Sequence, residues 1–226
     1  MKKQVSVTFM VFGLLFTVCL IVSNIVTQKL ISIGGIETTA GLIIFPVSYI
    51  INDLIAEVWG YRKARLIIWN GFLMNFLAVI IFRLSIWAPG SANFHNQTAF
   101  ELILGNTERI VAASFIAFLL GSFLNAFVMS KMKIMQHGRG FSIRAIASTI
   151  VGEGADSLVF FTLAFIGIIP MHALIMLILT QTAMKTGYEI LALPLTNYLV
   201  KWVKKHEETD VYDNGISYNP LKIKDI

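Results

Sequence analysis

Residues 46–65 read PVSYIINDLIAEVWGYRKAR, and this stretch decides the fold class. Its first three quarters are mostly apolar, yet they contain Asp53 and Glu57. The basic residues Arg62, Lys63 and Arg65 follow directly. Acidic residues inside an apolar segment that ends in a basic loop are typical of a membrane helix whose end faces the cytoplasm.

The composition of the whole chain agrees with a membrane protein. Of its 226 residues, 56% are hydrophobic and 14% are charged, against roughly 25% charged in a soluble domain. The mean hydropathy is +0.74. These values exclude a soluble enzyme, a disordered chain and a nucleic-acid-binding module that relies on surface charge. We therefore expect an all-α polytopic membrane protein embedded in the lipid bilayer.

Six segments are apolar enough to cross the hydrocarbon core, which takes roughly 20 helical residues. The first is too long for a cleaved signal peptide and lacks a small-residue cleavage site, so we expect a retained helix. Pro46 is expected to kink the second. A single transmembrane domain is expected over 1–203, followed by a polar, mobile cytoplasmic tail over 204–226. The predicted spans are about 7–28, 38–59, 64–86, 109–130, 143–168 and 172–201.

The distribution of basic residues predicts the orientation. Most of the 18 Lys and Arg residues lie at segment ends on one side. The positive-inside rule then places both termini in the cytoplasm, which requires an even number of spans. The net charge of +5 is therefore an orientation signal and implies no nucleic-acid partner. The second half of the outer loop 87–108 is amphipathic and predicts a short helix at the outer interface.

Cofactor chemistry finds no support in the sequence. The single cysteine, Cys19, excludes an internal disulfide and a cysteine-based metal cluster. The chain contains no Gly-x-x-x-x-Gly-Lys-Ser/Thr loop for ATP. We expect no metal, no cofactor and no catalytic residue, and energy must come from a gradient, a partner or trapping of the substrate.

Ionisable side chains within the spans are the candidate site. Each costs roughly 2.5–3.5 kcal/mol at a helix centre. We therefore expect them to face an interior cavity, to pair or to hold protons. Helical spacing arranges them in three stripes: Tyr49, Asp53 and Glu57; Glu153 and Asp156; and Gln181, Lys185 and Glu189.

Plainer interpretations of these stripes stay open. Lys185 and Glu189 are four residues apart and would suit an intrahelical ion pair. Glu57 lies close to Arg62 and Arg65 and would suit pairing with them. Paired carboxylates can also accept hydrogen bonds from a guanine-like edge, where a ring N–H lies beside an amine. A cation, an amino acid or a proton path would suit the same acids.

Two long motifs carry a family resemblance. Residues 46–65, residues 144–157 (RAIASTIVGEGADS) and the Ser23-Asn24 pair followed by Lys29 resemble the signatures of the queuosine precursor transporters. That family is also called the vitamin uptake transporters. The resemblance covers about 7–203, and Trp59 stands where the family is expected to have tyrosine.

The resemblance implies a bacterial inner-membrane importer with six helices and a fold similar to the substrate-binding components of energy-coupling-factor importers. Its substrates would be 7-cyano-7-deazaguanine and 7-aminomethyl-7-deazaguanine, with queuine as a third candidate, for salvage into tRNA queuosine. The residues that match the motifs and would bind substrate are Asn24, Asp53, Glu57, Glu153 and Asp156. Tyr49, Gln181, Lys185 and Glu189 join them from the spacing alone.

Other functions compete with this one. The chain could be a vitamin- or nucleobase-binding subunit that needs an energising ATPase partner. It could also be a structural or ion-conducting membrane protein. An intramembrane aspartyl protease would also place two acids on two helices, but the chain lacks the Gly-x-Gly-Asp arrangement of those enzymes. A homo-oligomer is left open.

Overall fold

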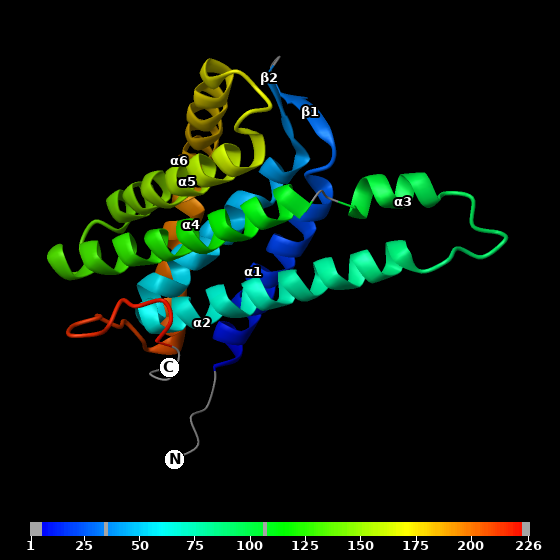
Figure 1. The fold of residues 1–226 in the computed structure, drawn as a ribbon. Coiled ribbons are helices and arrows are strands. Elements are labelled where there is room, and N and C mark those ends of the chain that lie inside the picture. Colours follow the sequence, from blue (N-terminus) through cyan, green and yellow to red (C-terminus); the bar gives the residue numbers. More distant parts are fainter. Residues whose placement is uncertain (1–5, 34–35, 106–107, 223–226) are drawn as a thin grey trace.

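The fold is a bundle of long helices, seen in a computed structural model that describes residues 6–33, 36–105 and 108–222. Helices α4 and α5 lie side by side, and α6 packs against α5 (Figure 1). The second half of α2 projects from the bundle with α3 folded back beside its end (Figure 1). The elements are α1 (Val7–Val26), β1 (Leu30–Ile33), β2 (Ile36–Thr39), the 3-10 helix η1 (Ala40–Ile43), α2 (Phe45–Trp87), α3 (Gln97–Leu104), α4 (Glu108–Met135), α5 (Phe141–Phe165) and α6 (Met171–Glu207).

Helix α2 departs from the prediction at its start. The helix begins at Phe45 and not near residue 38 as expected, because β1 and β2 form an antiparallel hairpin and η1 precedes the helix. The kink expected at Pro46 is also wrong, since this residue lies in the first turn of α2. A proline there loses no helical hydrogen bond.

The break in α2 falls instead at Gly60. Its φ of +80° and ψ of 173° are not helical, and only glycine adopts such a conformation without strain. The break divides α2 into two helical parts, which correspond to the predicted second and third spans. A Cβ atom at Gly60 would lie 2.7 Å from the Asp213 Oδ1 atom.

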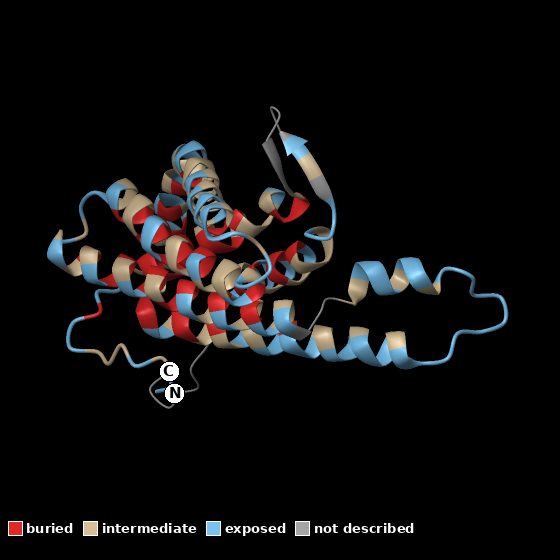
Figure 2. Ribbon diagram, turned by 45° about the horizontal axis from the view of Figure 1, so that its top comes forward, coloured by how far each residue is buried: buried red, intermediate tan, exposed pale blue. Residues whose placement is uncertain are grey.

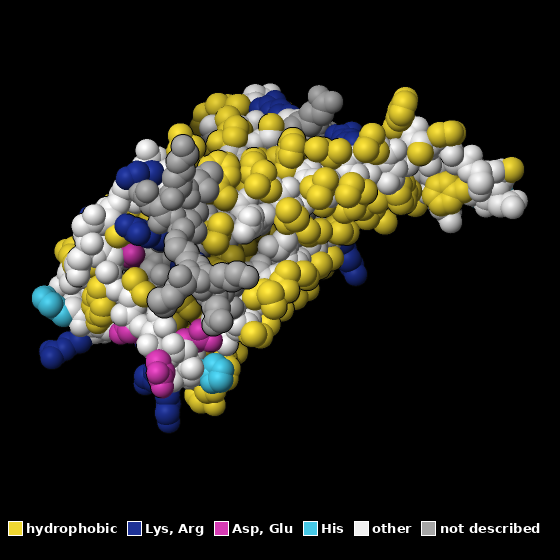
Figure 3. All heavy atoms as spheres, turned by 90° about the horizontal axis from the view of Figure 1, so that it is seen from below, with side chains coloured by type: hydrophobic (Ala, Val, Ile, Leu, Met, Phe, Trp, Pro, Cys, Tyr) yellow, Lys and Arg dark blue, Asp and Glu magenta, His cyan; other side chains and the backbone are white. Residues whose placement is uncertain are grey.

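Four stretches of the described residues are long and apolar enough to cross a membrane: Val7–Val26, Ala40–Trp87, Gln97–Met135 and Phe141–Phe165. The second has 48 residues and includes both parts of α2. Hydrophobic side chains cover much of the elongated part of the molecule in Figure 3. Several acidic and basic side chains gather at its left end in the same view. These features are those of a polytopic membrane protein. Helix α6, which carries Lys185, Glu189 and Pro194, is not among the four.

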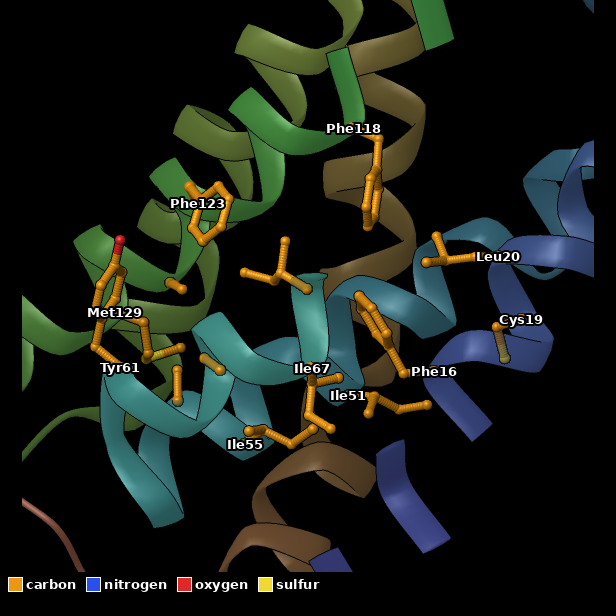
Figure 4. Close-up of a cluster of buried hydrophobic side chains, with 14 of the residues drawn as sticks. Phe16, Cys19, Leu20, Ile51, Ile55, Tyr61, Ile67, Phe118, Phe123 and Met129 are labelled. Carbon is orange, nitrogen blue, oxygen red and sulfur yellow. The ribbon is translucent and has the colours of Figure 1, made fainter. Parts of the chain in front are cut away.

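The buried core lies where α1, α2 and α4 meet (Figure 2). Figure 4 shows Phe16, Ile51, Ile67, Phe118 and Phe123 pointing toward one another from these helices. Helices α4 and α5 approach closely at two glycines, because a Cβ atom on Gly152 would lie 2.8 Å from the Gly121 carbonyl oxygen. Small residues permit this approach between membrane helices, and it brings the polar side chains of α5 next to α2.

The C-terminal tail, expected to be mobile, packs against the helices where the structure describes it. Asp213 is 5% exposed and accepts hydrogen bonds from the Tyr61 amide and the Ser130 hydroxyl. The Arg65 guanidinium donates to the Asn219 carbonyl oxygen at 2.8 Å. The tail therefore forms a strap over the break in α2 and the C-terminal end of α4.

Candidate functional site

The charged side chains inside the bundle form two clusters. The first lies at the end of the bundle that the strap covers and is called the inner-end cluster. It consists of Glu57, Lys133, Arg144, Lys204 and Asp210. The central cluster consists of Tyr49, Asp53, Glu153, Asp156, Lys185 and Glu189. The predicted stripe of Tyr49, Asp53 and Glu57 is thus divided between the two clusters.

Lys185 of α6 is held by two carboxylates of α5. Its Nζ atom lies 2.6 Å from Glu153 Oε2 and 2.9 Å from Asp156 Oδ2. The same ammonium group stands 4.5 Å from the centre of the Phe45 ring. Lys185 is therefore paired across helices, and the intrahelical pair with Glu189 is not the arrangement in this structure. A single ammonium between two acids and an aromatic face occupies the position that a ligand cation would take.

Asp53 and Tyr49 of α2 face the same region. Asp53 is fully buried and accepts hydrogen bonds from the Ser148 hydroxyl at 3.2 Å to each carboxylate oxygen. A Cβ atom added to Gly121 would lie 2.6 Å from the Tyr49 hydroxyl and 2.8 Å from the Asp156 Cβ atom. Gly121 thus leaves room for the side chains of α2 and α5 to meet.

Several buried polar atoms of the central region lack a hydrogen-bond partner among the described residues. Buried polar groups are nearly always satisfied in folded proteins, and exceptions call for an explanation such as a ligand or water. Here they come from α5 and α6, on the helix faces that carry the acids. The atoms are Thr149 Oγ1, Glu153 Oε1, Ser157 Oγ, Thr186 Oγ1 and Glu189 Oε1.

Glu57 has a different environment from the other acids. Arg144 Nη2 lies 2.9 Å from each of its carboxylate oxygens, and Lys204 Nζ lies 2.6 Å from Oε1. Lys133 donates to its carbonyl oxygen. The alternative of pairing with Arg62 and Arg65 is wrong, because Arg62 is exposed and Arg65 bonds the strap. Glu57 therefore joins α2 to α4, α5 and α6.

Asp210 extends the inner-end cluster into the strap. Lys133 Nζ lies 2.5 Å and Lys204 Nζ 2.8 Å from its Oδ1 atom. Partial burial acts to raise the pKa of Asp210, but the hydrogen bonds and charges of the two lysines outweigh it and hold the pKa below its ordinary value. Asp210 thus stays ionised and ties the strap to α4 and α6.

Asn24 lies apart from the acids. The Asn24 side chain donates to Asn75 Oδ1 at 2.9 Å, in a small cavity that Arg83 also lines and that includes no residue of the central cluster. Gln181 lies one turn before Lys185 on α6 and is partly buried. An apolar groove of about 440 Å³ runs between α1, α2 and α6, with Tyr188 and Thr196 among its lining residues. Its lining suits a hydrocarbon chain better than a polar ligand.

Sequence reasoning missed several contributors. The sequence does not predict that Arg144, in the 144–157 motif, and Lys133, among the basic residues of the orientation pattern, pair with Glu57. Ser148 lies five residues before Glu153, off the one-turn spacing of the predicted stripe, so that spacing did not identify it as a donor. No local pattern indicated Asp213, because its contact with Tyr61 joins residues 152 positions apart.

A helical membrane protein with ionisable side chains buried between its helices has the organisation of a transporter. A sequence model of the family described as "Putative vitamin uptake transporter" matches residues 39–199. The chain belongs to this family. It is a transporter and not an enzyme.

Three curated bacterial relatives support this assignment. A protein of Bacillus subtilis named "Probable queuosine precursor transporter" is 26% identical over 195 residues, which cover 85% of this chain and 83% of that protein. The "Queuosine precursor transporter" of Escherichia coli is 31% identical over 63% of this chain and 62% of its own length. A protein of Haemophilus influenzae with the same name as that of Bacillus subtilis is 29% identical over 62% of this chain and 59% of its own length. No solved structure matches the chain.

Proposed function

We propose that this protein imports queuosine precursors across the bacterial inner membrane for salvage into tRNA queuosine. The substrates are 7-cyano-7-deazaguanine and 7-aminomethyl-7-deazaguanine, with queuine as a third candidate. The names of the relatives support the substrate class. The single observation that carries the proposal is the central cluster, where buried acids in excess of their cations surround Lys185.

Glu153 and Asp156 are the proposed acceptors for the ring N–H and exocyclic amine of the deazaguanine. A carboxylate accepts two parallel hydrogen bonds from such an edge. Phe45 and Tyr49, whose ring centres are 5.6 Å apart, offer an aromatic surface beside the acids. Asp53 and Glu189 complete the proposed contacts of the ligand. Asn24 and Gln181 remain predicted contacts, and Glu57 is assigned to the inner-end cluster.

We also propose the membrane arrangement that the sequence predicts. Six spans would form one domain over 1–203, with both termini and the tail 204–226 in the cytoplasm. The division of α2 at Gly60 supports two spans within one continuous element. Because α6 runs from Met171 to Glu207, 37 residues are available for the sixth span and its cytoplasmic extension. A fold like that of energy-coupling-factor binding components and a homo-oligomer both stay predictions.

Uptake of labelled precursor by cells unable to make it tests the proposal. Wild-type protein should restore accumulation, and Glu153→Gln and Asp156→Asn should each reduce it at least tenfold at equal membrane abundance. Glu101→Gln is the control, since this acid is exposed on α3. Full uptake by both site variants would overturn the site assignment. Uptake by the purified protein in liposomes separates an autonomous transporter from a subunit that needs an ATPase.

A further inference from the structure

The central cluster contains more acid than its cation can neutralise. Helix α2 contributes Tyr49 and Asp53, α5 contributes Glu153 and Asp156, and α6 contributes Lys185 and Glu189. From α4 the neighbouring polar side chains are the uncharged Ser122 and Asn125. With every acid ionised, four negative charges would face one ammonium group. An interior of low polarity disfavours such an excess, so protons or a ligand cation must offset it.

Glu189 is the acid of the central cluster with the fewest hydrogen-bond donors and cations beside it among the described residues. Its side chain is 1% exposed, and its Oε1 atom accepts no hydrogen bond from any residue that the structure describes. It lies within Coulombic range of Glu153 and Asp53. Lys185 lies one turn before Glu189 on the same face of α6, but its ammonium group points to Glu153 and Asp156 of α5 instead of to Glu189. Asp53, in contrast, has the Ser148 hydroxyl, and Glu57 has its own cations.

We propose that Glu189 is a proton-binding site and that Lys185 couples this site to the ligand. The inference rests on the proposed function, because it takes the ligand to be a deazaguanine with an aminomethyl cation. That cation takes the place of the Lys185 ammonium group between Glu153 and Asp156, so the aminomethyl form presents its ring N–H edge to Asp53 rather than to these two acids. Lys185 then turns to Glu189, one helical turn and about 6 Å away along the axis. The carboxyl O–H bond of Glu189 breaks, and its proton passes to water.

The charge balance follows from this exchange. One ligand cation enters, one proton leaves, and the site keeps its net charge. Binding of the aminomethyl form therefore releases about one proton. Its affinity rises up to tenfold for each unit of increasing pH, as long as Glu189 is protonated in the empty protein. The cyano form is neutral and has no need to displace Lys185, so its affinity changes little with pH.

Calorimetric titration of the purified full-length protein tests the proposal. Each ligand is titrated at one pH in two buffers of different ionisation enthalpy, which gives the number of protons released. The wild type and the control Glu101→Gln should release about one proton with the aminomethyl form and none with the cyano form. Glu189→Gln and Glu189→Met should bind the aminomethyl form without proton release, and either one suffices if the other does not fold.

The outcomes separate this inference from the proposed function. Saturable binding of the aminomethyl form to wild-type protein without proton release overturns the coupling and leaves the proposed function intact. Proton release that is unchanged in Glu189→Gln overturns Glu189 as the proton site. Absence of binding to both deazaguanines overturns the proposed function, and this inference fails with it.

Discussion

Asp213 in the strap caps the second part of α2, which begins at Tyr61. Its Oδ2 atom accepts a hydrogen bond from the Tyr61 amide at 2.8 Å, although the two residues are 152 positions apart. Tyr61 is the first residue after the break at Gly60, and the first amides of a helix need partners outside it. An acidic side chain at such a position satisfies a free amide and interacts favourably with the helix dipole. The strap therefore helps to define where the second part of α2 begins.

Substitution of the capping residue should destabilise the protein without touching the central cluster. Asp213→Ala removes the acceptor of the Tyr61 amide and the Ser130 hydroxyl, and loss of a cap costs about 1 kcal/mol. Gly60→Ala should cost more, since it strains a positive φ and places Cβ 2.7 Å from Asp213 Oδ1. Thermal unfolding in detergent measures both. Gly187→Ala in α6 is the control, because no atom lies within 4 Å of its added Cβ, and an equal loss there would contradict the argument.

Gly121→Ala should block the central cluster. The new methyl group would lie 2.6 Å from the Tyr49 hydroxyl and 2.8 Å from the Gly152 carbonyl oxygen. Real Cβ atoms do not approach so closely, so α4 and α5 must separate. We expect uptake to fall at least tenfold at equal membrane abundance. Gly154→Ala on α5 is the matched variant, since its Cβ meets only Thr182 Cγ2 at 3.8 Å. Equal uptake by the two variants would show that the close approach at Gly121 does not matter.

The sequence predicted the charged residues of the central cluster but not their pairing. The spacing of Lys185 and Glu189 on one helix allows an intrahelical pair, and only the packing of α5 against α6 presents Glu153 and Asp156 to the ammonium group. The helix α3 was predicted from its amphipathic pattern. The hairpin of β1 and β2 was not, because a short segment of apolar and polar residues has no period that separates strand from helix. The strap was missed because polarity alone says nothing of contacts made across the chain.

Glu57→Gln should destabilise the fold strongly. It leaves the buried Arg144, which is 0% exposed, without its carboxylate, and breaking a buried ion pair by removing one partner costs about 3–5 kcal/mol. The double variant Glu57→Gln with Arg144→Gln should recover part of this loss, because the uncompensated charge is gone. A double-mutant cycle on thermal stability measures the coupling. A fully stable Glu57→Gln that has lost only ligand binding would instead assign Glu57 to the substrate.

The strap should show a pH dependence through Asp210. Its pKa is held below the ordinary value by Lys133 and Lys204, so its ionised form is favoured in the folded state. The contribution to stability is therefore complete above the ordinary pKa of about 3.9 and is lost as the pH falls below it. Asp210→Asn should lower the melting temperature near neutral pH, and its difference from wild type should shrink as the pH falls below about 4. The exposed acid in the control Glu101→Gln should give a small difference throughout. A difference for Asp210→Asn that persists at low pH would mean that the two lysines do not depend on the charge of Asp210, and that the strap is held by its hydrogen bonds alone.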